Sequence, residues 1–282
     1  MNDQIPAWAG ESFSLQYATL NDTTIPYLVG GDGPDLLMIH GLSASLDWWQ
    51  HNAPALASRF RVHLVDLPGF GRLGHLNQTH DIQGYADWLL AFMDSIDLRR
   101  PHLVGLSMGG DIAVRVAARY PDRVGRLVLA TPAAILPGGS MFAWAITGIR
   151  VLTEIPASLI PLAIRDGRWV DLQTLWRTSR NLITRDVRDL MPDVQAETLI
   201  LASNNDPVIP PWLAESFADS IPNSRLAVFP GAGHLVMLSQ PDQFNQQVIS
   251  FLLEDDQESA GLPSATRKSP DCTGRQVMKN TT

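Results

Sequence analysis

The stretch LVGLSMGGD, residues 103–111, decides how this chain folds, because it joins an apolar run to a helical one through a serine set among glycines. The glycines can simply make a tight turn that lets a strand and a helix pack closely. The pattern G-x-S-x-G, formed by Gly105, Ser107 and Gly109, is also the turn that exposes a nucleophilic serine above a sheet. The rest of the chain has to decide between these two interpretations.

The composition is that of a globular protein with a sizeable core: 282 residues, 45% hydrophobic and 18% charged. A formal net charge of -8, without any basic run, disfavours a nucleic-acid partner. Cys272 is the only cysteine, so we expect no intramolecular disulfide and no cysteine metal site. The first ten residues lack the apolar segment of a secretory signal, which favours a cytoplasmic location.

Apolar runs bounded by turn residues recur along the chain, at 35–41, 60–69, 101–107, 125–132, 197–203 and 224–231. Such runs are typical of strands buried on both faces of a parallel sheet. Amphipathic stretches between them predict helices: one over 82–96 with Asp81 as N-cap, and one from Met108 towards Tyr120 that ends before Pro121. The alternation predicts a right-handed, doubly wound α/β sheet with its ligand site beyond the C-terminal ends of the strands.

The alternation breaks over residues 133–193, which we interpret as a helical cap inserted into an α/β core made of 1–132 and 194–255. The sequence of this segment fits either a lid that moves or a group of helices that keeps one position. The segment contains Trp144, Trp169 and Trp176, and we expect it to wall an apolar acyl pocket.

Two other segments stand apart from the core. Residues 134–149 are apolar but shorter than the ~20 residues a membrane span needs, and Pro137 interrupts them, so we expect no stable span. We interpret this segment as an apolar surface that something else covers. Residues 256–282 are polar and without pattern, which predicts a disordered C-terminal tail.

A serine nucleophile requires a histidine base and a carboxylate, expected downstream in the order serine, acid, histidine. His234, in FPGAGHLVML, is the one histidine after Ser107 and follows the strand predicted at 224–231. Asp206, in NNDPVIP, follows the strand predicted at 197–203. Asp206 could instead form an Asx turn beside the next proline, and His234 could be a structural loop residue. Asp193 is the alternative acid, but it precedes its strand.

Acyl transfer also needs two donors for an oxyanion. The backbone N–H of Met108 directly follows the nucleophile, and that of Leu42, in HGLSAS, lies in the loop after the first parallel strand. Gly41 lets this loop approach closely. No metal or cofactor is expected, because the histidines lack ligand spacing and no G-x-G-x-x-G follows the first strand.

The motifs HGLSAS, DLPGFG, GLSMGG, NNDPVIP and GAGHLVML resemble, in order, the landmark motifs of the α/β-hydrolase superfamily, over about residues 24–253. The resemblance implies an α/β-hydrolase fold: a mainly parallel eight-stranded sheet, a helical cap at 133–193 and a triad of Ser107, Asp206 and His234. It also implies a structural, non-catalytic turn at Asp66, Pro68, Gly69 and Gly71.

Departures from individual subfamilies narrow the expected activity. Haloalkane dehalogenases and epoxide hydrolases carry an aspartate nucleophile, where this chain has Ser107, and epoxide hydrolases a proline at the position of Ser43. Carbon–carbon bond hydrolases usually show asparagine where Leu106 stands. We therefore expect a serine hydrolase that cleaves a small-molecule carboxylic ester with an apolar acyl part. The alternatives are a C–C bond hydrolase of a vinylogous diketone, a cofactor-free perhydrolase and a non-enzymatic ligand-binding receptor on the same fold.

Overall fold

The computed structural model describes residues 5–74, 76, 80–133 and 141–254. Contacts divide the chain into two units, Met1–Leu252 and Leu253–Thr282, and the first holds the sheet and the helices that pack on it. The predicted tail at 256–282 and the first part of the apolar segment, 134–140, lie outside the described residues.

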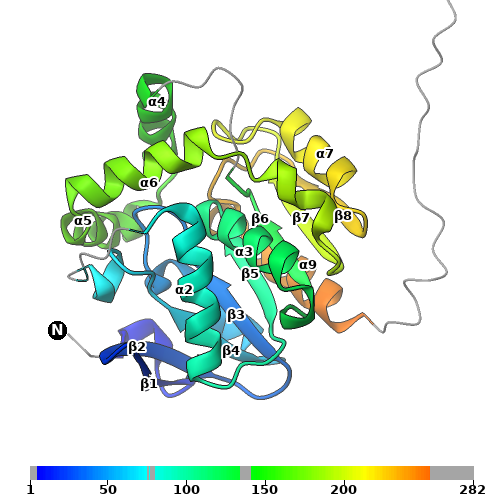
Figure 1. The fold of residues 1–282 in the computed structure, drawn as a ribbon. Coiled ribbons are helices and arrows are strands. Elements are labelled where there is room, and N and C mark those ends of the chain that lie inside the picture. Colours follow the sequence, from blue (N-terminus) through cyan, green and yellow to red (C-terminus); the bar gives the residue numbers. More distant parts are fainter. Residues whose placement is uncertain (1–4, 75, 77–79, 134–140, 255–282) are drawn as a thin grey trace, which may run out of the picture. The chain divides into compact units, whose positions relative to one another are not determined.

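An eight-stranded sheet in the order β1-β2-β4-β3-β5-β6-β7-β8 organises the first unit (Figure 1). Its strands are β1 (Phe13–Leu20), β2 (Thr23–Gly30), β3 (Asp35–Ile39), β4 (Arg61–Val65), β5 (His102–Leu106), β6 (Leu127–Ala130), β7 (Thr198–Ser203) and β8 (Ser224–Phe229). The pairs β1–β2 and β2–β4 are antiparallel and the other five are parallel. The predicted mainly parallel, eight-stranded sheet is confirmed, and each of the six apolar runs contains one of the strands β3 to β8.

The N-terminal hairpin β1–β2 has a different sequence character. Buried and exposed residues mix along β1, as expected for an antiparallel edge strand with one face towards water. Asn21 and Asp22 make its turn at φ 44° and 61°, a left-handed conformation that these two residue types tolerate best after glycine. Because β1 and β2 are not continuous apolar runs, the pattern that predicts the other six strands does not predict these two.

Helices cover both faces of the sheet. They are α1 (Ala53–Leu56), α2 (Ile82–Ser95), α3 (Met108–Arg119), α7 (Pro211–Ser220), α8 (Val236–Ser239) and α9 (Pro241–Leu253). Short 3₁₀ turns lie at Ala7–Ala9, Leu46–Trp49, Gly71–Leu73, Pro121–Arg123, Ala157–Leu159 and Arg188–Asp193. The predicted N-cap of α2 is confirmed, since the Asp81 carboxylate accepts the N–H of Gly84 at 2.8 Å. Helix α3 ends before Pro121, as predicted.

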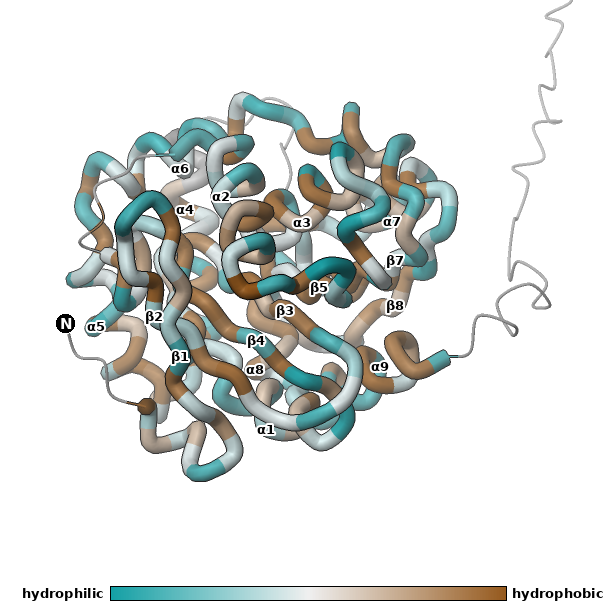
Figure 2. The backbone as a smooth tube through the Cα atoms, turned by 60° about the horizontal axis from the view of Figure 1, so that its bottom comes forward, coloured by the Kyte–Doolittle hydropathy of each residue, from teal (hydrophilic) through white to brown (hydrophobic). Residues whose placement is uncertain are grey.

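Two hydrophobic cores lie on opposite faces of the sheet. Strand β3 shows the division: Leu37 and Ile39 pack with α2, α3 and α7, while Leu36 and Met38 pack with α1, α8 and α9. All four side chains are fully buried. Figure 2 shows the central strands as hydrophobic segments among helices of mixed hydropathy. Burial on both faces fixes the strands, and with them the loops at their C-terminal ends.

Between β6 and β7 the chain forms the helices α4 (Met141–Leu152), α5 (Ile160–Trp169) and α6 (Leu172–Thr184). Helix α6 contacts both α4 and α2. The side chains of Phe142, Ile146 and Ile149 from the apolar segment are 76%, 45% and 63% exposed, so the described part of the chain covers them only in part. No single described helix is long and apolar enough to cross a membrane; only 145–152 and 157–169 together meet that criterion, across a 109° bend.

Candidate active site

Ser107 stands at a strained turn between β5 and α3. Its φ of 51° and ψ of -113° are rare for a residue with a side chain. A Cβ added to Gly105 would lie 2.4 Å from the Gly109 carbonyl oxygen, and one added to Gly109 would lie 2.4 Å from that of Ile39. Both positions therefore need glycine. The tight turn and the position of the half-buried Ser107 are thus two aspects of one structure, because the close approach of strand and helix sets the backbone of the serine.

His234 and Asp206 form a hydrogen-bonded pair below the surface. His234 Nδ1 lies 2.9 Å from Asp206 Oδ2, and the two side chains are 6% and 0% exposed. The second carboxylate oxygen of Asp206 accepts the N–H groups of Val208 and Ile209 at 2.6 and 3.0 Å. The aspartate thus makes the turn expected beside Pro207 and also orients the histidine. Nδ1–H donates to the carboxylate, so Nε2 is the nitrogen that can accept a proton.

The sheet brings the histidine loop to the edge where Ser107 lies. The N–H of Ser107 donates to Ala130 O at 2.9 Å, at the end of β6. The next residue, Thr131, donates through Oγ1 to the carbonyl of His234 at 2.9 Å. From β7, Ser203 Oγ donates to Gly233 O at 2.8 Å. The C-terminal ends of β6 and β7, the two strands that follow β5 in the sheet, therefore hold the loop of His234.

The two expected oxyanion donors flank the serine. Met108 is the first residue of α3, so its N–H has no acceptor within the helix. In the part of the chain that the structure describes, neither this N–H nor that of Leu42 donates to another backbone or side-chain group. The Leu42 loop lies close by, because a Cβ on Gly41 would be 3.5 Å from Ser107 Cβ. The assignment of both donors stays a prediction.

His40 fixes the backbone of that loop in its neutral form. Its Nε2 accepts the N–H of Leu67 at 2.9 Å, so Nδ1 carries the proton and donates to Gly41 O at 2.8 Å. Complete burial lowers the pKa of His40, against the opposing charge of Asp66. Asp66 in turn accepts the N–H groups of Leu46 and Arg72 at 2.6 and 2.7 Å. These bonds match the structural role expected of the Asp66 turn.

Glu154, which follows α4, reaches the histidine loop from the inserted helices, and no motif in the sequence predicts this contact. Its Oε2 accepts the N–H of Leu235 at 3.1 Å. A Cβ on Gly233 would lie 2.3 to 2.4 Å from the three carboxyl atoms of Glu154, so glycine is what admits this carboxylate. Burial raises the pKa of Glu154, opposed by the Leu235 N–H and by His234. Glu154 thus contacts both neighbours of His234.

Helix α5 makes a second polar contact, with the segment that follows the Leu42 loop. Asp166, fully buried, accepts Ser45 Oγ at 2.7 Å and Trp48 Nε1 at 2.8 Å. Arg165 binds the same carboxylate at 2.8 Å and the buried Asp47 at 2.6 Å. Burial raises the pKa of Asp166, and its hydrogen bonds and the Arg165 charge oppose this. The inserted segment is therefore attached at two places, to the residues after Leu42 through Asp166 and to the histidine loop through Glu154.

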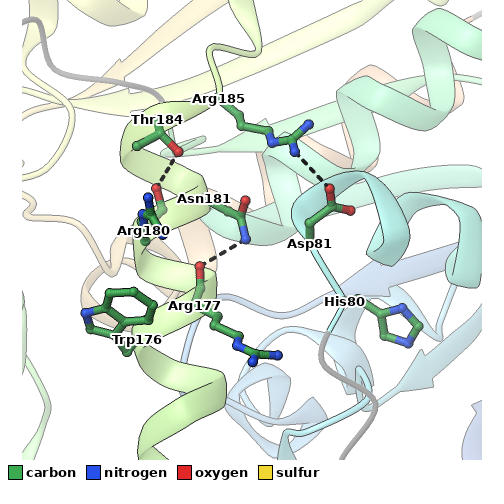
Figure 3. Close-up of a pocket in the computed structure, with 8 residues that line it drawn as sticks. All are labelled: His80, Asp81, Trp176, Arg177, Arg180, Asn181, Thr184 and Arg185. Carbon is green, nitrogen blue, oxygen red and sulfur yellow. Dashed lines mark hydrogen bonds and ion pairs between the residues drawn. The ribbon is translucent and has the colours of Figure 1, made fainter.

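A polar cavity of about 640 Å³ lies elsewhere, between α6 and the start of α2 (Figure 3). Its lining contains none of the predicted catalytic residues and consists of His80, Asp81, Trp176, Arg177, Arg180, Asn181, Thr184 and Arg185. Arg185 forms an ion pair with Asp81 across it at 3.2 Å. Among the described residues, no group of histidines, cysteines and carboxylates is placed to hold a metal ion.

Comparison with known proteins places this fold in a family. The model of an alpha/beta hydrolase family matches residues 36–247. Carboxylesterase YbfK of Bacillus subtilis is 29% identical over 78% of this chain and 81% of its own length. The 2-hydroxy-6-oxo-6-phenylhexa-2,4-dienoate hydrolase of Burkholderia cepacia is 26% identical over 86% of this chain and 97% of its own.

Solved structures agree with this match. The crystal structure of a membrane phospholipase A, a bacterial virulence factor, superposes with a TM-score of 0.76 and 27% identity, over 89% of this chain and 88% of the other. The matched segment contains the serine turn, the Asp206–His234 pair and the inserted helices, and the relatives include esterases and C–C bond hydrolases. The chain therefore belongs to the alpha/beta hydrolase family, and its activity is that of a hydrolase.

Proposed function

We propose that this hydrolase cleaves a carboxylic ester through an acyl-enzyme, with Ser107 as nucleophile, His234 as base and Asp206 as the group that orients the base. The hydrogen bond from His234 Nδ1 to Asp206 Oδ2 carries the proposal, because it turns the basic Nε2 away from the carboxylate. The buried carboxylate stabilises the imidazolium that forms when Nε2 accepts a proton.

The reaction proceeds in two halves. As Ser107 Oγ attacks the ester carbonyl, its proton passes to His234 Nε2, and the oxyanion receives the N–H groups of Leu42 and Met108. The imidazolium returns the proton to the departing alkoxide, which leaves as an alcohol. Water then attacks the acyl-enzyme, giving its proton to His234, and the carboxylic acid is released as Ser107 regains a proton.

Residues 133–193 serve in this proposal as a cap that forms the acyl side of the pocket over a core of 1–132 and 194–255. The described part of the segment supports this, since Glu154 and Asp166 attach it beside the histidine and Leu42 loops. A pocket roofed by the inserted helices suits a small-molecule ester with an apolar acyl group.

Covalent labelling tests the nucleophile. A fluorophosphonate probe should label the parent chain at Ser107 and leave Ser107→Ala unlabelled, and the variant should lose several orders of magnitude of kcat on short p-nitrophenyl esters while its circular dichroism stays unchanged. Equal turnover by the two proteins would exclude Ser107 as nucleophile. A parent chain that neither takes the label nor turns over esters would point to the ligand-binding alternative.

A C–C bond hydrolase is the second candidate, favoured by the similarity to the Burkholderia cepacia enzyme. The same serine, histidine and aspartate would then act on a vinylogous diketone with a carbon leaving group. Leu106 stands where such enzymes usually carry asparagine, which favours the ester. Three parallel assays separate the candidate activities. Turnover of p-nitrophenyl esters indicates an esterase, turnover of a ring-fission dienoate indicates a C–C bond hydrolase, and reaction of peroxide with a carboxylic acid indicates a perhydrolase.

A further inference from the structure

Helix α4 presents a row of apolar side chains outwards. Phe142, Ile146, Ile149 and Leu152 follow one another at three- and four-residue spacing and are 76%, 45%, 63% and 61% exposed. Val151, on the other side of the helix, is half-buried. A helix on a water-exposed protein surface normally turns its apolar stripe towards the core, so this orientation needs a partner.

The other two helices of the cap repeat the pattern. On α5, Ile160 and Ile164 are 48% and 58% exposed, and on α6, Leu172 and Trp176 are 82% and 51% exposed. Eight of the thirteen exposed large hydrophobic residues in the described structure lie on these three helices. Scattered exposed apolar residues are ordinary, but a concentration on one segment marks an interaction surface.

Each of these helices also carries an exposed arginine: Arg150 on α4, Arg168 on α5 and Arg180 on α6. Within the described residues, none of the three has a carboxylate within 4.0 Å, although most other arginines do. Arg180 stacks on Trp176, with its guanidinium carbon 5.4 Å from the ring (Figure 3). This local positive charge stands out on a chain of net charge -8.

We infer that the outer surface of α4, α5 and α6 binds the headgroup region of an anionic phospholipid bilayer. Outward apolar and aromatic side chains beside arginines are the composition of helices that lie in a membrane interface. Charge decides between this partner and a second copy of the chain: a symmetric dimer through this face would bring the arginines of two copies together, whereas anionic headgroups neutralise them. The acidic remainder of the chain is repelled by the same bilayer, which favours contact through the cap.

Vesicle binding of the full chain tests the inference. We expect co-sedimentation with phosphatidylglycerol vesicles, much weaker binding to phosphatidylcholine vesicles, and loss of binding as salt rises. The double variant Ile146→Ser, Ile149→Ser should bind at least about tenfold more weakly, since apolar burial drives insertion. Arg150→Gln and Arg168→Gln together should weaken binding about 25-fold, at about fivefold for each charge.

Matched controls lie outside the cap. Trp212→Ser removes an exposed aromatic residue of α7, and Arg59→Gln removes an exposed arginine; both should bind like the parent. Hydrolysis of a soluble p-nitrophenyl ester without vesicles is measured for every variant beside vesicle binding, so that a failure of the catalytic proposal and a failure of this inference are told apart. Absence of binding to phosphatidylglycerol, or equal binding by the cap variants and their controls, would overturn the inference. So would a dimer in sedimentation that the Ile146→Ser, Ile149→Ser variant abolishes.

Discussion

The contact between Glu154 and the histidine loop gives a quantitative prediction through Gly233→Ala. The added methyl would lie 2.3 to 2.4 Å from the Glu154 carboxyl atoms. These atoms end a flexible side chain, so they can move aside. The loss of folding free energy is then no larger than the contribution of the contacts that the Glu154 carboxylate gives up. A hydrogen bond to a charged group contributes about 1.5–3 kcal/mol. Glu154 is only half-buried, so we expect Gly233→Ala to lower the free energy of unfolding by about 1–2 kcal/mol.

A double-mutant cycle separates this cause from a general intolerance of alanine. Glu154→Ala alone should cost about as much as Gly233→Ala, and the double variant no more than either, since both remove the same contact. Urea denaturation gives the free energies, and kcat on a soluble ester shows whether displacement of the loop also misplaces His234. Additive losses of stability would refute the reasoning, because they would mean that the methyl collides with something other than Glu154.

Three further variants probe other parts of the site. Asp206→Asn keeps an oxygen for the Val208 and Ile209 N–H groups but favours the wrong tautomer of His234, so kcat should fall about 10⁴-fold with little change in thermal stability; a kcat near that of the parent would exclude Asp206 as the orienting acid. Asp166→Ala leaves Ser45 Oγ and Trp48 Nε1 buried without their acceptor and should cost about 3 kcal/mol or more in urea denaturation; a loss below that of an average surface variant would contradict the buried anchor. Burial raises the pKa of Asp111 to about 6, against the attraction of Arg115. Between pH 4 and 6 this carboxyl therefore binds more protons in the folded chain than in the unfolded one and makes stability fall as pH rises. Asp111→Asn removes that contribution, so its free energy of unfolding should rise more steeply with pH over this range than that of the parent; parallel curves would show that the pKa is not raised.

The sequence predicts the parallel part of the sheet because strands buried on both faces must be continuously apolar, as at 101–107 and 197–203. The candidate catalytic positions follow from the same strands, since Asp206 and His234 come directly after two of them. The structure places these two side chains within hydrogen-bond distance, and their role in catalysis stays a prediction.

Glu154 and Asp166 could not be predicted in the same way. Glu154 bonds to a core residue more than 80 positions away along the chain. Asp166 bonds to core residues more than 110 positions away. Such pairs depend on how the inserted helices pack over the core, and no periodicity in the sequence records that packing. Gly233 alone does not predict the contact, since Gly148 and Gly167 likewise lack a left-handed φ and have no group within 4 Å of an added Cβ.

The attachment of α5 through Asp166 has a consequence for how new substrate ranges can arise in this enzyme. A substitution that shifts α5 must break the hydrogen bonds that the buried Asp166 carboxylate accepts. The free energy lost in most such changes would be a large part of the total stability of a folded domain. Helices α4 and α6 carry no comparable buried ion pair to the core among the described residues. Directed evolution towards bulkier or differently shaped substrates should therefore accumulate its accepted substitutions on α4 and α6, while α5 stays unchanged.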